Sequence, residues 1–420
     1  MTVAPGEPTA TIVAVGDVAL SAFGDGQPER RAVALAAVEE QLGGADLRLA
    51  NLETVLTRRD ERVGRMGSYL RADPEAIEVL ERGGFDVVTC ANNHCLDFGP
   101  EALRESAERL RAAGLSVCGV GATPEEARAP VVRTVNGVRV GVLGYCDDWK
   151  PVGEEPTYMP AGAVDADILA DIAALRARVD VVVLQLHWGW EWAVHPLLTH
   201  RDRARRFAES GADLVLCHHA HVPMAVEAWG RSLIAHGLGN FLFPWSTSRP
   251  HPWCDRSYIL HVGISARGVH EARIIPVECR DRRVSPSEGW RKRELLGGMS
   301  ALGEALHDED RLAMLETDRT IREGRDLARR VVMFVERGDV ERIGEVAGSL
   351  RVPRSRALVE ALSALPDGSG AQLAPVLCEA ADGDGTTVLM HAARDGRLQA
   401  AAGMLDASAH LSLEPRGRTP

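Results

Sequence analysis

Short apolar runs alternate with longer amphipathic segments between residues 11 and 276, and this alternation is the strongest constraint on the fold. Segments 74–84 and 100–114 begin with proline and close with glycine, as helices do. The pattern predicts an α/β domain. The apolar runs that are typical of buried strands lie at residues 11–17, 47–51, 86–92, 115–120, 179–187 and 212–218.

Two hairpin signals indicate that the sheet is mixed. The stretch VVRTVNGVRVGVLGY consists of two alternating runs around Asn136-Gly137, a dipeptide that favours a two-residue hairpin turn. A second pair of runs flanks Trp229-Gly230-Arg231. Because a tight hairpin joins antiparallel strands and a helical crossover joins parallel ones, we expect both kinds of pairing.

The composition changes near residue 280. We therefore predict an α/β domain at 1–280, a charged helical connector at 281–330 and an all-α segment at 331–420. Near the end, six residues match the turn and first helix of an ankyrin repeat: Gly385, Thr387, Leu389, Ala392, Ala393 and Gly396. A single repeat cannot bury its own face, so we expect a truncated ankyrin-like array. One degenerate helical hairpin is the alternative.

Charge and patterning disfavour several classes of partner. The chain has 48 Lys and Arg against 60 Asp and Glu, a net charge of -12, so its surface repels nucleic acid and anionic membranes. It begins without a basic leader, and no window reaches the eighteen apolar residues of a membrane span, which predicts a cytoplasmic protein. The eight cysteines form no CxxC pair and are expected to be reduced core residues.

Three histidines stand in the stretch LCHHAHVP, residues 216–223, at the end of a predicted strand. His219 and His221 are separated by one residue, so both can reach one centre. Successive strand residues point to opposite faces, so we expect His218 to face away from His219 and to serve packing.

Other metal-competent residues also stand at or just past the ends of predicted strands. Because ligands of open α/β sheets gather at the carboxyl ends of the strands, we expect these segments to converge there. Taken singly, each residue has a second interpretation as a helix cap, a turn residue or a hydrogen-bonded core histidine. The residues are Asp17, Asn51, Glu53, Asn92, Asn93, His94 and His187.

The mixture of imidazole, carboxylate and amide groups suits a pair of borderline divalent ions, namely manganese, iron or zinc. Such a pair would bind substrate oxygens and lower the pKa of a bridging water, which would generate hydroxide near neutral pH. The residues therefore predict a hydrolytic centre.

At these motifs the sequence resembles the CapA family of poly-gamma-glutamate capsule biosynthesis proteins, of the calcineurin-like metallophosphoesterase superfamily. The resemblance covers about residues 11–277. It implies a metallophosphatase-like sandwich of two mixed β-sheets flanked by helices, with the metal site at the loop-bearing edge. The matching motifs are VGDVAL, NLET, ANNHCLDFG, GVLGY, HWGWEW, GADLVLCHHAHV and HGLGNFLF.

The resemblance also implies the ligands. The first ion would bind Asp17 and His221, and either Glu53 or Asn51 would bridge to the second. The second ion would bind Asn93, His187 and His219. Two departures leave a one-metal site open: Ala19 replaces a histidine usual in related phosphoesterases, and NLE replaces a motif that carries an aspartate.

Two further residues receive catalytic roles from the resemblance. His94 would be the general acid, or would steady the leaving oxygen, and Asp97 would orient its imidazole. Beside them, the segments 187–192 and 240–253 are rich in tryptophan and phenylalanine. Their rings would form either a wall beside the metals or a plug at the end of the sandwich.

Two functions follow from these expectations. The first is a metal-dependent hydrolase that cleaves a phosphoester, or an amide or γ-glutamyl bond, by metal-bound hydroxide. The second is a non-catalytic protein, or one that assists amide ligation, acting with a protein partner bound by the ankyrin-like tail. The sequence contains no Gly-rich phosphate loop for ATP.

Overall fold

The structure is a computed structural model that describes residues 6–24, 26–63, 69–147, 157–243 and 252–316. The chain divides into two compact units, Met1–Glu309 and Asp310–Pro420. All elements below belong to the first unit. The ankyrin-like segment predicted at 331–420 lies outside the described residues, so it stays a prediction.

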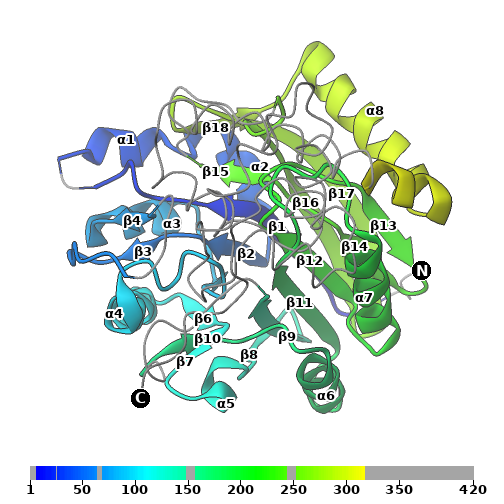
Figure 1. Ribbon diagram of the computed structural model, residues 1–420, viewed down its shortest axis with the longest axis horizontal. Helices are drawn as coiled ribbons and strands as arrows, with labels where there is room; N and C mark the ends of the chain where they lie inside the picture. Colours follow the sequence, from blue (N-terminus) through cyan, green and yellow to red (C-terminus); the bar gives the residue numbers. More distant parts are fainter. Residues whose placement is uncertain (1–5, 25, 64–68, 148–156, 244–251, 317–420) are drawn as a thin grey trace, which may run out of the picture. The chain divides into compact units, whose positions relative to one another are not determined.

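The first sheet combines a parallel half with an antiparallel half (Figure 1). It contains β1 Thr9–Val18, β2 Leu47–Leu52, β5 Val87–Thr89, β6 Ser116–Cys118, β15 Asn240–Leu242, β16 Arg256–Ser265, β17 Gly268–Arg280 and β18 Arg283–Pro286. Their order is β18-β17-β16-β1-β2-β5-β6, and β15 pairs with the end of β1. Strands β16 to β18 are antiparallel, whereas β1, β2, β5, β6 and β15 are parallel.

The second sheet is also mixed. It contains β8 Val131–Val135, β9 Val138–Cys146, β11 Val181–His187, β12 Leu214–His218, β13 Val226–Trp229 and β14 Ser232–Ala235. The order is β13-β14-β12-β11-β9-β8. Both predicted hairpins are confirmed, as β8–β9 and β13–β14. At the first turn Asn136 and Gly137 have φ of 48° and 82°, the left-handed values that a two-residue hairpin turn of this kind requires.

Helices flank the two sheets, and the described residues add two small strand pairs. The helices are α1 Pro28–Val33, α2 Glu39–Gly43, α3 Glu78–Arg82, α4 Gly99–Ala112, α5 Pro124–Ala127, α6 Asp165–Arg176, α7 Leu198–Glu209 and α8 Gly289–Ala305. Short 3-10 helices lie at Ala36–Val38 and Pro74–Ile77. The strand pairs are β3 Val55–Leu56 with β4 Arg71–Ala72, and β7 Val120–Gly121 with β10 Met159–Pro160.

Period-two alternation sorts the core into layers. Ile12 and Ala14 of β1 belong to the cluster between the sheets, while Val13 and Val15 join the cluster on the outer side of the first sheet. On β12, Leu216 faces inward, and Cys217 joins the outer cluster that contains residues of α6 and α7. The predicted pair of mixed sheets flanked by helices is therefore confirmed.

The strand ends position the loops that matter for function. All six predicted strands are present, but the one expected at 86–92 is shorter, since β5 ends at Thr89. The following loop carries Asn93 and His94 out of the sheet. We placed the domain boundary at residue 280, which is where β17 ends. Strand β18 pairs with β17, and α8 follows β18 within the same compact unit, which extends to Glu309.

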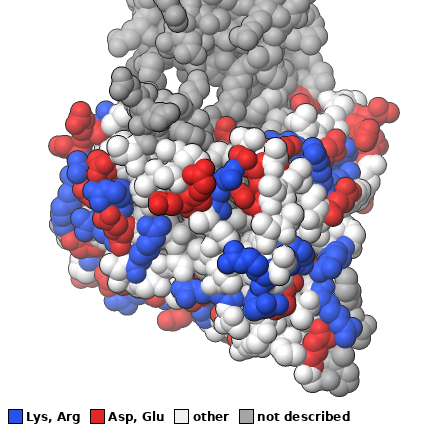
Figure 2. All heavy atoms as spheres, turned by 90° about the horizontal axis from the view of Figure 1, so that it is seen from below, with Lys and Arg blue, Asp and Glu red and all other residues white. Residues whose placement is uncertain are grey.

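Surface features bear on the class of protein. None of the described helices combines the length and apolarity needed to cross a bilayer. On the face seen in Figure 2, acidic and basic side chains are interspersed. The seven described cysteines are buried, as predicted.

Candidate metal centre

Five segments meet at the carboxyl ends of β1, β2, β5, β11 and β12: two are the strand ends of β1 and β11, and three are loops. Each contributes a buried polar side chain: Asp17, Glu53, Asn93, His187 and His219 are at most 5% exposed. His221, from the same loop as His219, is 3% exposed. The predicted convergence at this edge is therefore what the structure shows.

A close backbone approach sets the position of Asp17. A Cβ atom at Gly16 would lie 1.9 Å from the carbonyl oxygen of Gly239, so only glycine fits there. Gly239 has a φ of 76°, and its carbonyl accepts the Asp17 N–H at 2.9 Å. This contact places Asp17 opposite Asn240 in the register of β1 and β15.

The Asp17 carboxylate is surrounded by donors. Its Oδ1 accepts hydrogen bonds from Asn51 Nδ2 at 2.8 Å and from His218 Nδ1 at 3.1 Å, and its Oδ2 accepts the His219 backbone N–H at 3.3 Å. Burial by itself raises the pKa of Asp17, but the hydrogen bond and charge of His218, the charge of His221 and the Asn51 amide outweigh burial. The pKa lies below its ordinary value, so Asp17 is an anionic ligand candidate.

The expectation that His218 serves only packing is wrong. Its imidazole contacts Asp17 inside the site and is 2% exposed. The alternation rule placed His218 and His219 on opposite faces, but the rule applies only to extended backbone. His219 has a φ of 83°, so the strand ends at His218 and the next residue turns back toward the same centre.

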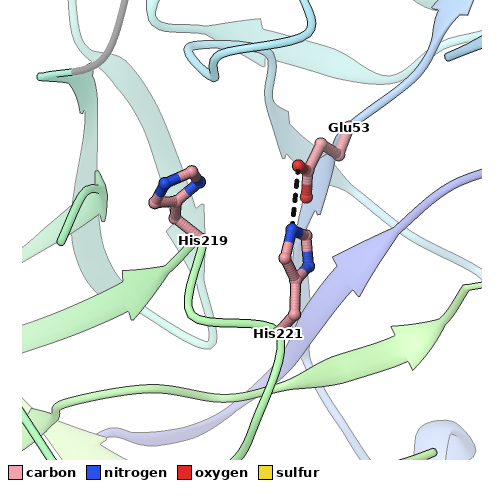
Figure 3. A group of neighbouring side chains, drawn as sticks. All are labelled: Glu53, His219 and His221. Atoms are coloured by element: carbon pink, nitrogen blue, oxygen red, sulfur yellow. Dashed lines mark ion pairs between the residues drawn. The ribbon is translucent and has the colours of Figure 1, made fainter. Parts of the chain in front are cut away.

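The loop after β12 contains two residues in the left-handed backbone conformation. His219 and His221 have φ of 83° and 57°, values that cost energy for residues other than glycine and that cluster at functional sites. Figure 3 shows both imidazoles on this loop, with Glu53 facing His221. The unusual backbone directs two imidazoles, one residue apart, toward one carboxylate.

Glu53 lies at the centre of the site. Its Oε1 is 3.6 Å from His221 Nε2, 3.8 Å from His187 Nε2 and 3.9 Å from His94 Nε2. The side chain is fully buried. One carboxylate oxygen thus faces imidazoles from three separate segments of the chain, the arrangement expected of a bridging ligand.

A second group of donors gathers around His187. Its Nε2 is 2.8 Å from Asn93 Oδ1 and 3.0 Å from His219 Nδ1. Burial lowers the pKa of His187 well below its ordinary value, and the nearby imidazoles, His219 first, lower it further. A neutral imidazole retains the lone pair that metal binding requires.

Asn51 occupies a different place from Glu53. Its amide nitrogen faces Asp17 and lies 3.3 Å from His187 Nδ1, while its Oδ1 accepts a hydrogen bond from Asn92 at 3.3 Å. Of the two residues predicted as alternatives for the bridge, Glu53 presents an oxygen to the centre. Asn51 steadies Asp17 from the side.

His94 and Asp97 form a buried pair beside the centre. His94 Nδ1 is 2.7 Å from Asp97 Oδ2, which also accepts the backbone N–H of Leu70 at 2.7 Å. The Asp97 carbonyl accepts the N–H of Val63 at 2.9 Å. Because a carboxylate is acceptor-only, His94 carries a proton on Nδ1 and turns Nε2 toward Glu53.

The aromatic rings divide between the core and the site. Trp188 stacks on Phe207 in the outer core, and Phe241 is fully buried in the core on the outer side of the first sheet. Trp192 stacks on His221 with ring centroids 5.1 Å apart, and Phe243 meets the same imidazole edge-on at 5.0 Å. These two rings form a wall beside the site.

The donor set fits divalent ions. Candidate ligand atoms lie within 4.8 Å of one another in two buried groups, Glu53 with His219 and His221, and Asp17 with Glu53 and His187. Ligands bound at about 2.0 to 2.2 Å stand up to about 4.4 Å apart across one ion, so small side-chain movements complete each group. Imidazoles mixed with carboxylates are the ligands that borderline divalent ions prefer.

Asn240 lies in the motif HGLGNFLF but was not among the predicted site residues. Asn240 Oδ1 is 2.9 Å from His221 Nδ1, and the residue is fully buried. It begins β15 instead of following a strand, so a search of strand ends does not find it. An asparagine within the otherwise apolar run at 238–243 was the signal available in the sequence.

Comparison with known proteins identifies the family of this chain. A family model described as bacterial capsule synthesis protein PGA_cap matches residues 11–244. The PGA biosynthesis protein CapA of Bacillus subtilis is 26% identical over 258 residues, which are 59% of this chain and 66% of that protein. A probable polyglutamine synthesis accessory protein of Mycobacterium tuberculosis is 28% identical over 220 residues, 49% of this chain and 57% of that protein.

The chain spans less than two thirds of the length of either relative. Among solved structures, a 5'-nucleotidase from Candida albicans has a TM-score of 0.39 and 11% identity, covering 73% of this chain and 55% of that one. The family match covers more than half of the chain and includes all nine predicted site residues. The chain therefore belongs to the bacterial capsule synthesis protein family PGA_cap, which confirms the predicted CapA relationship.

Proposed function

We propose that this protein is a metal-dependent hydrolase of the metallophosphoesterase type. Two divalent ions would be held by Asp17, Glu53, Asn93, His187, His219 and His221. The observation that carries the proposal is the buried Glu53 carboxylate, whose Oε1 lies within 3.9 Å of three imidazoles from three separate segments of the chain. Packing alone does not account for a buried carboxylate among three imidazoles, whereas metal ligation does.

When bound, such ions polarise substrate oxygens and lower the pKa of water. The remaining chemistry belongs to the chain. Asp97 accepts the Nδ1 proton of His94, so Nε2 faces the centre, where it would donate a proton to a leaving oxygen or nitrogen. The Asp97 carboxylate stabilises the charged imidazolium that this step consumes.

The substrate is either a phosphoester or an amide or γ-glutamyl bond. The printed role of the Bacillus subtilis relative in PGA biosynthesis supports the γ-glutamyl choice. Both reactions develop negative charge on oxygen, which the same centre would stabilise, so the loops decide between them.

A second candidate is an accessory protein without catalysis. The name of the Mycobacterium tuberculosis relative, an accessory protein, favours it. In that case the ions would hold the loops together, and a partner would bind the predicted ankyrin-like tail.

Elemental analysis of protein purified without chelator tests the first proposal. We expect about two equivalents of manganese, iron or zinc, with loss of metal in the His219→Ala/His221→Ala variant. His94→Ala should keep its metal and lose about 10²- to 10⁴-fold in turnover on a phosphoester and γ-glutamyl panel. Wild-type protein that cannot be loaded with metal would exclude the hydrolase. Full metal loading without turnover would favour the accessory role.

A further inference from the structure

The amide of Asn240 uses all of its principal hydrogen-bonding groups. Its Nδ2 donates to the carbonyl oxygens of His221 at 3.1 Å and Cys254 at 3.0 Å. Its Oδ1 lies 2.9 Å from His221 Nδ1. The residue is fully buried, so no water replaces any of these partners.

These contacts determine the orientation of the amide. Backbone carbonyls only accept hydrogen bonds, so the group that faces His221 O and Cys254 O must be the NH₂. A flipped amide would place its oxygen against two oxygens, at the cost of two buried hydrogen bonds. Asn240 Oδ1 therefore faces the imidazole of His221.

The orientation of Asn240 in turn determines the tautomer of His221. An amide oxygen is acceptor-only, so His221 Nδ1 must carry the proton. A second group near this nitrogen, Asp17 Oδ2 at 3.5 Å, is also an acceptor. A neutral imidazole protonated on Nδ1 has its lone pair on Nε2, which lies 3.6 Å from Glu53 Oε1.

The ring has little freedom to rotate out of this arrangement. Trp192 stacks on one face and Phe243 meets it edge-on, with centroid distances of 5.1 and 5.0 Å. His221 itself is 3% exposed. Packing thus limits the ring position, while Asn240 selects which nitrogen bears the proton.

We propose that Asn240 is a positioning residue that holds His221 in the Nδ1–H tautomer and presents its Nε2 to the metal centre. The effect on metal binding rests on the proposed function, whereas the tautomer does not. The competing explanation is that Asn240 only ties the His221 loop to the segment at Cys254.

The test uses the full-length protein with ¹⁵N-labelled histidine, and a His221→Gln variant assigns the signal. In the metal-free wild type we expect the nitrogen shifts of the Nδ1–H form. In Asn240→Ala we expect a mixture of tautomers and a Mn²⁺ affinity lower by about 10- to 100-fold. Asn240→Asp keeps an acceptor but loses both donors, so it should keep the tautomer while its melting temperature falls.

Ser257→Ala is the matched control. Ser257 is also fully buried, and its hydroxyl donates to Leu238 O at 2.7 Å next to Gly239. Its loss should lower the melting temperature without changing the His221 signal or the Mn²⁺ affinity. That result would separate local destabilisation from positioning.

Three outcomes overturn the proposal: an Nε2–H form in the wild type, an unchanged tautomer in Asn240→Ala, or a changed tautomer with unchanged Mn²⁺ affinity in a protein that binds Mn²⁺. An Nδ1–H wild type that depends on Asn240 but binds no metal would support the tautomer assignment. It would refute the proposed hydrolase instead.

Discussion

At the scale of single residues, one backbone dihedral angle decides which histidines share the site. The left-handed φ of His219 ends the strand and lets His218 contact Asp17 from the sheet, while His219 and His221 reach the centre from the loop. Burial raises the pKa of Asp17, and the hydrogen bond from His218 is the largest of the effects that lower it. His218 therefore supports Asp17, a ligand candidate, from within the site.

Replacing His218 with phenylalanine tests this role. His218→Phe keeps an aromatic ring but removes the hydrogen-bond donor to Asp17. We expect the Mn²⁺ affinity to fall by about tenfold, because residues that hydrogen-bond to metal ligands orient those ligands. Calorimetric titration measures the affinity. Leu216→Met, two residues earlier on the same face, is the control and should leave the affinity unchanged. Equal affinities for wild type and His218→Phe would restore the packing interpretation.

At the scale of elements, the site depends on the approach of β1 and β15. Gly16 touches the Gly239 carbonyl, and a side chain there must push the two strands apart. We expect Gly16→Ala to destabilise the protein by about 1 to 3 kcal/mol and to reduce metal loading, because Asp17 is the next residue. Thermal unfolding and elemental analysis measure the two effects.

Gly43→Ala provides the contrast for that substitution. A Cβ at Gly43, in α2, meets no atom within 4 Å, so this change should be neutral or slightly stabilising. If Gly16→Ala behaved like Gly43→Ala, the close approach would not control the site.

A second element contact, between α7 and β13, predicts a pH dependence of stability. Glu227 of β13 is 4% exposed and accepts hydrogen bonds from Arg205 of α7 at 2.6 Å and from His236 at 3.0 Å. Burial raises the pKa of Glu227, but the bonds and charges of His236 and Arg205 lower it from 4.5 to about 2. This carboxylate links the helix to the sheet.

Because the pKa of Glu227 is lower in the folded protein, the unfolded chain binds more protons between pH 4.5 and about 2. The stabilisation, about 3 kcal/mol at most, is complete above pH 4.5 and is lost as the pH falls toward 2. Glu227→Gln should destabilise the protein at pH 7, and its difference from wild type should shrink below pH 4.5. Urea unfolding at several pH values measures this. Glu81 is exposed, so the free energy of unfolding of Glu81→Gln should show the same pH dependence as that of the wild type. If the difference in this free energy between Glu227→Gln and the wild type stayed constant with pH, the linkage would be contradicted.

At the scale of the whole molecule, all nine predicted site residues lie in the compact unit Met1–Glu309. We therefore expect deletion of residues 317–420 to leave metal content and the melting transition of this unit unchanged. If the accessory role holds, the same deletion should abolish capture of a protein partner. Loss of metal from the shortened protein would show that the site needs the C-terminal part.

Local sequence patterns were enough to predict several features of the whole molecule. The apolar runs, the Asn136-Gly137 turn and the residue types at the strand ends could be predicted, because each depends on neighbours within a few positions. They were sufficient to place Asp17, Glu53, Asn93, His187, His219 and His221 at one edge of the sheets.

The choice among those residues required the folded chain. Glu53 presents its oxygen to the centre, Asn51 supports Asp17, and Asn240 holds His221. These pairings arise where distant segments meet, as Asp17 meets the backbone N–H of His219, 202 positions away. The left-handed turn at His219 and the contact of Gly16 with Gly239 decide these pairings. The sequence by itself determined which side chains were available at this edge. Tertiary structure decided their partners, because hydrogen bonds depend on distance and direction, which periodicity does not contain.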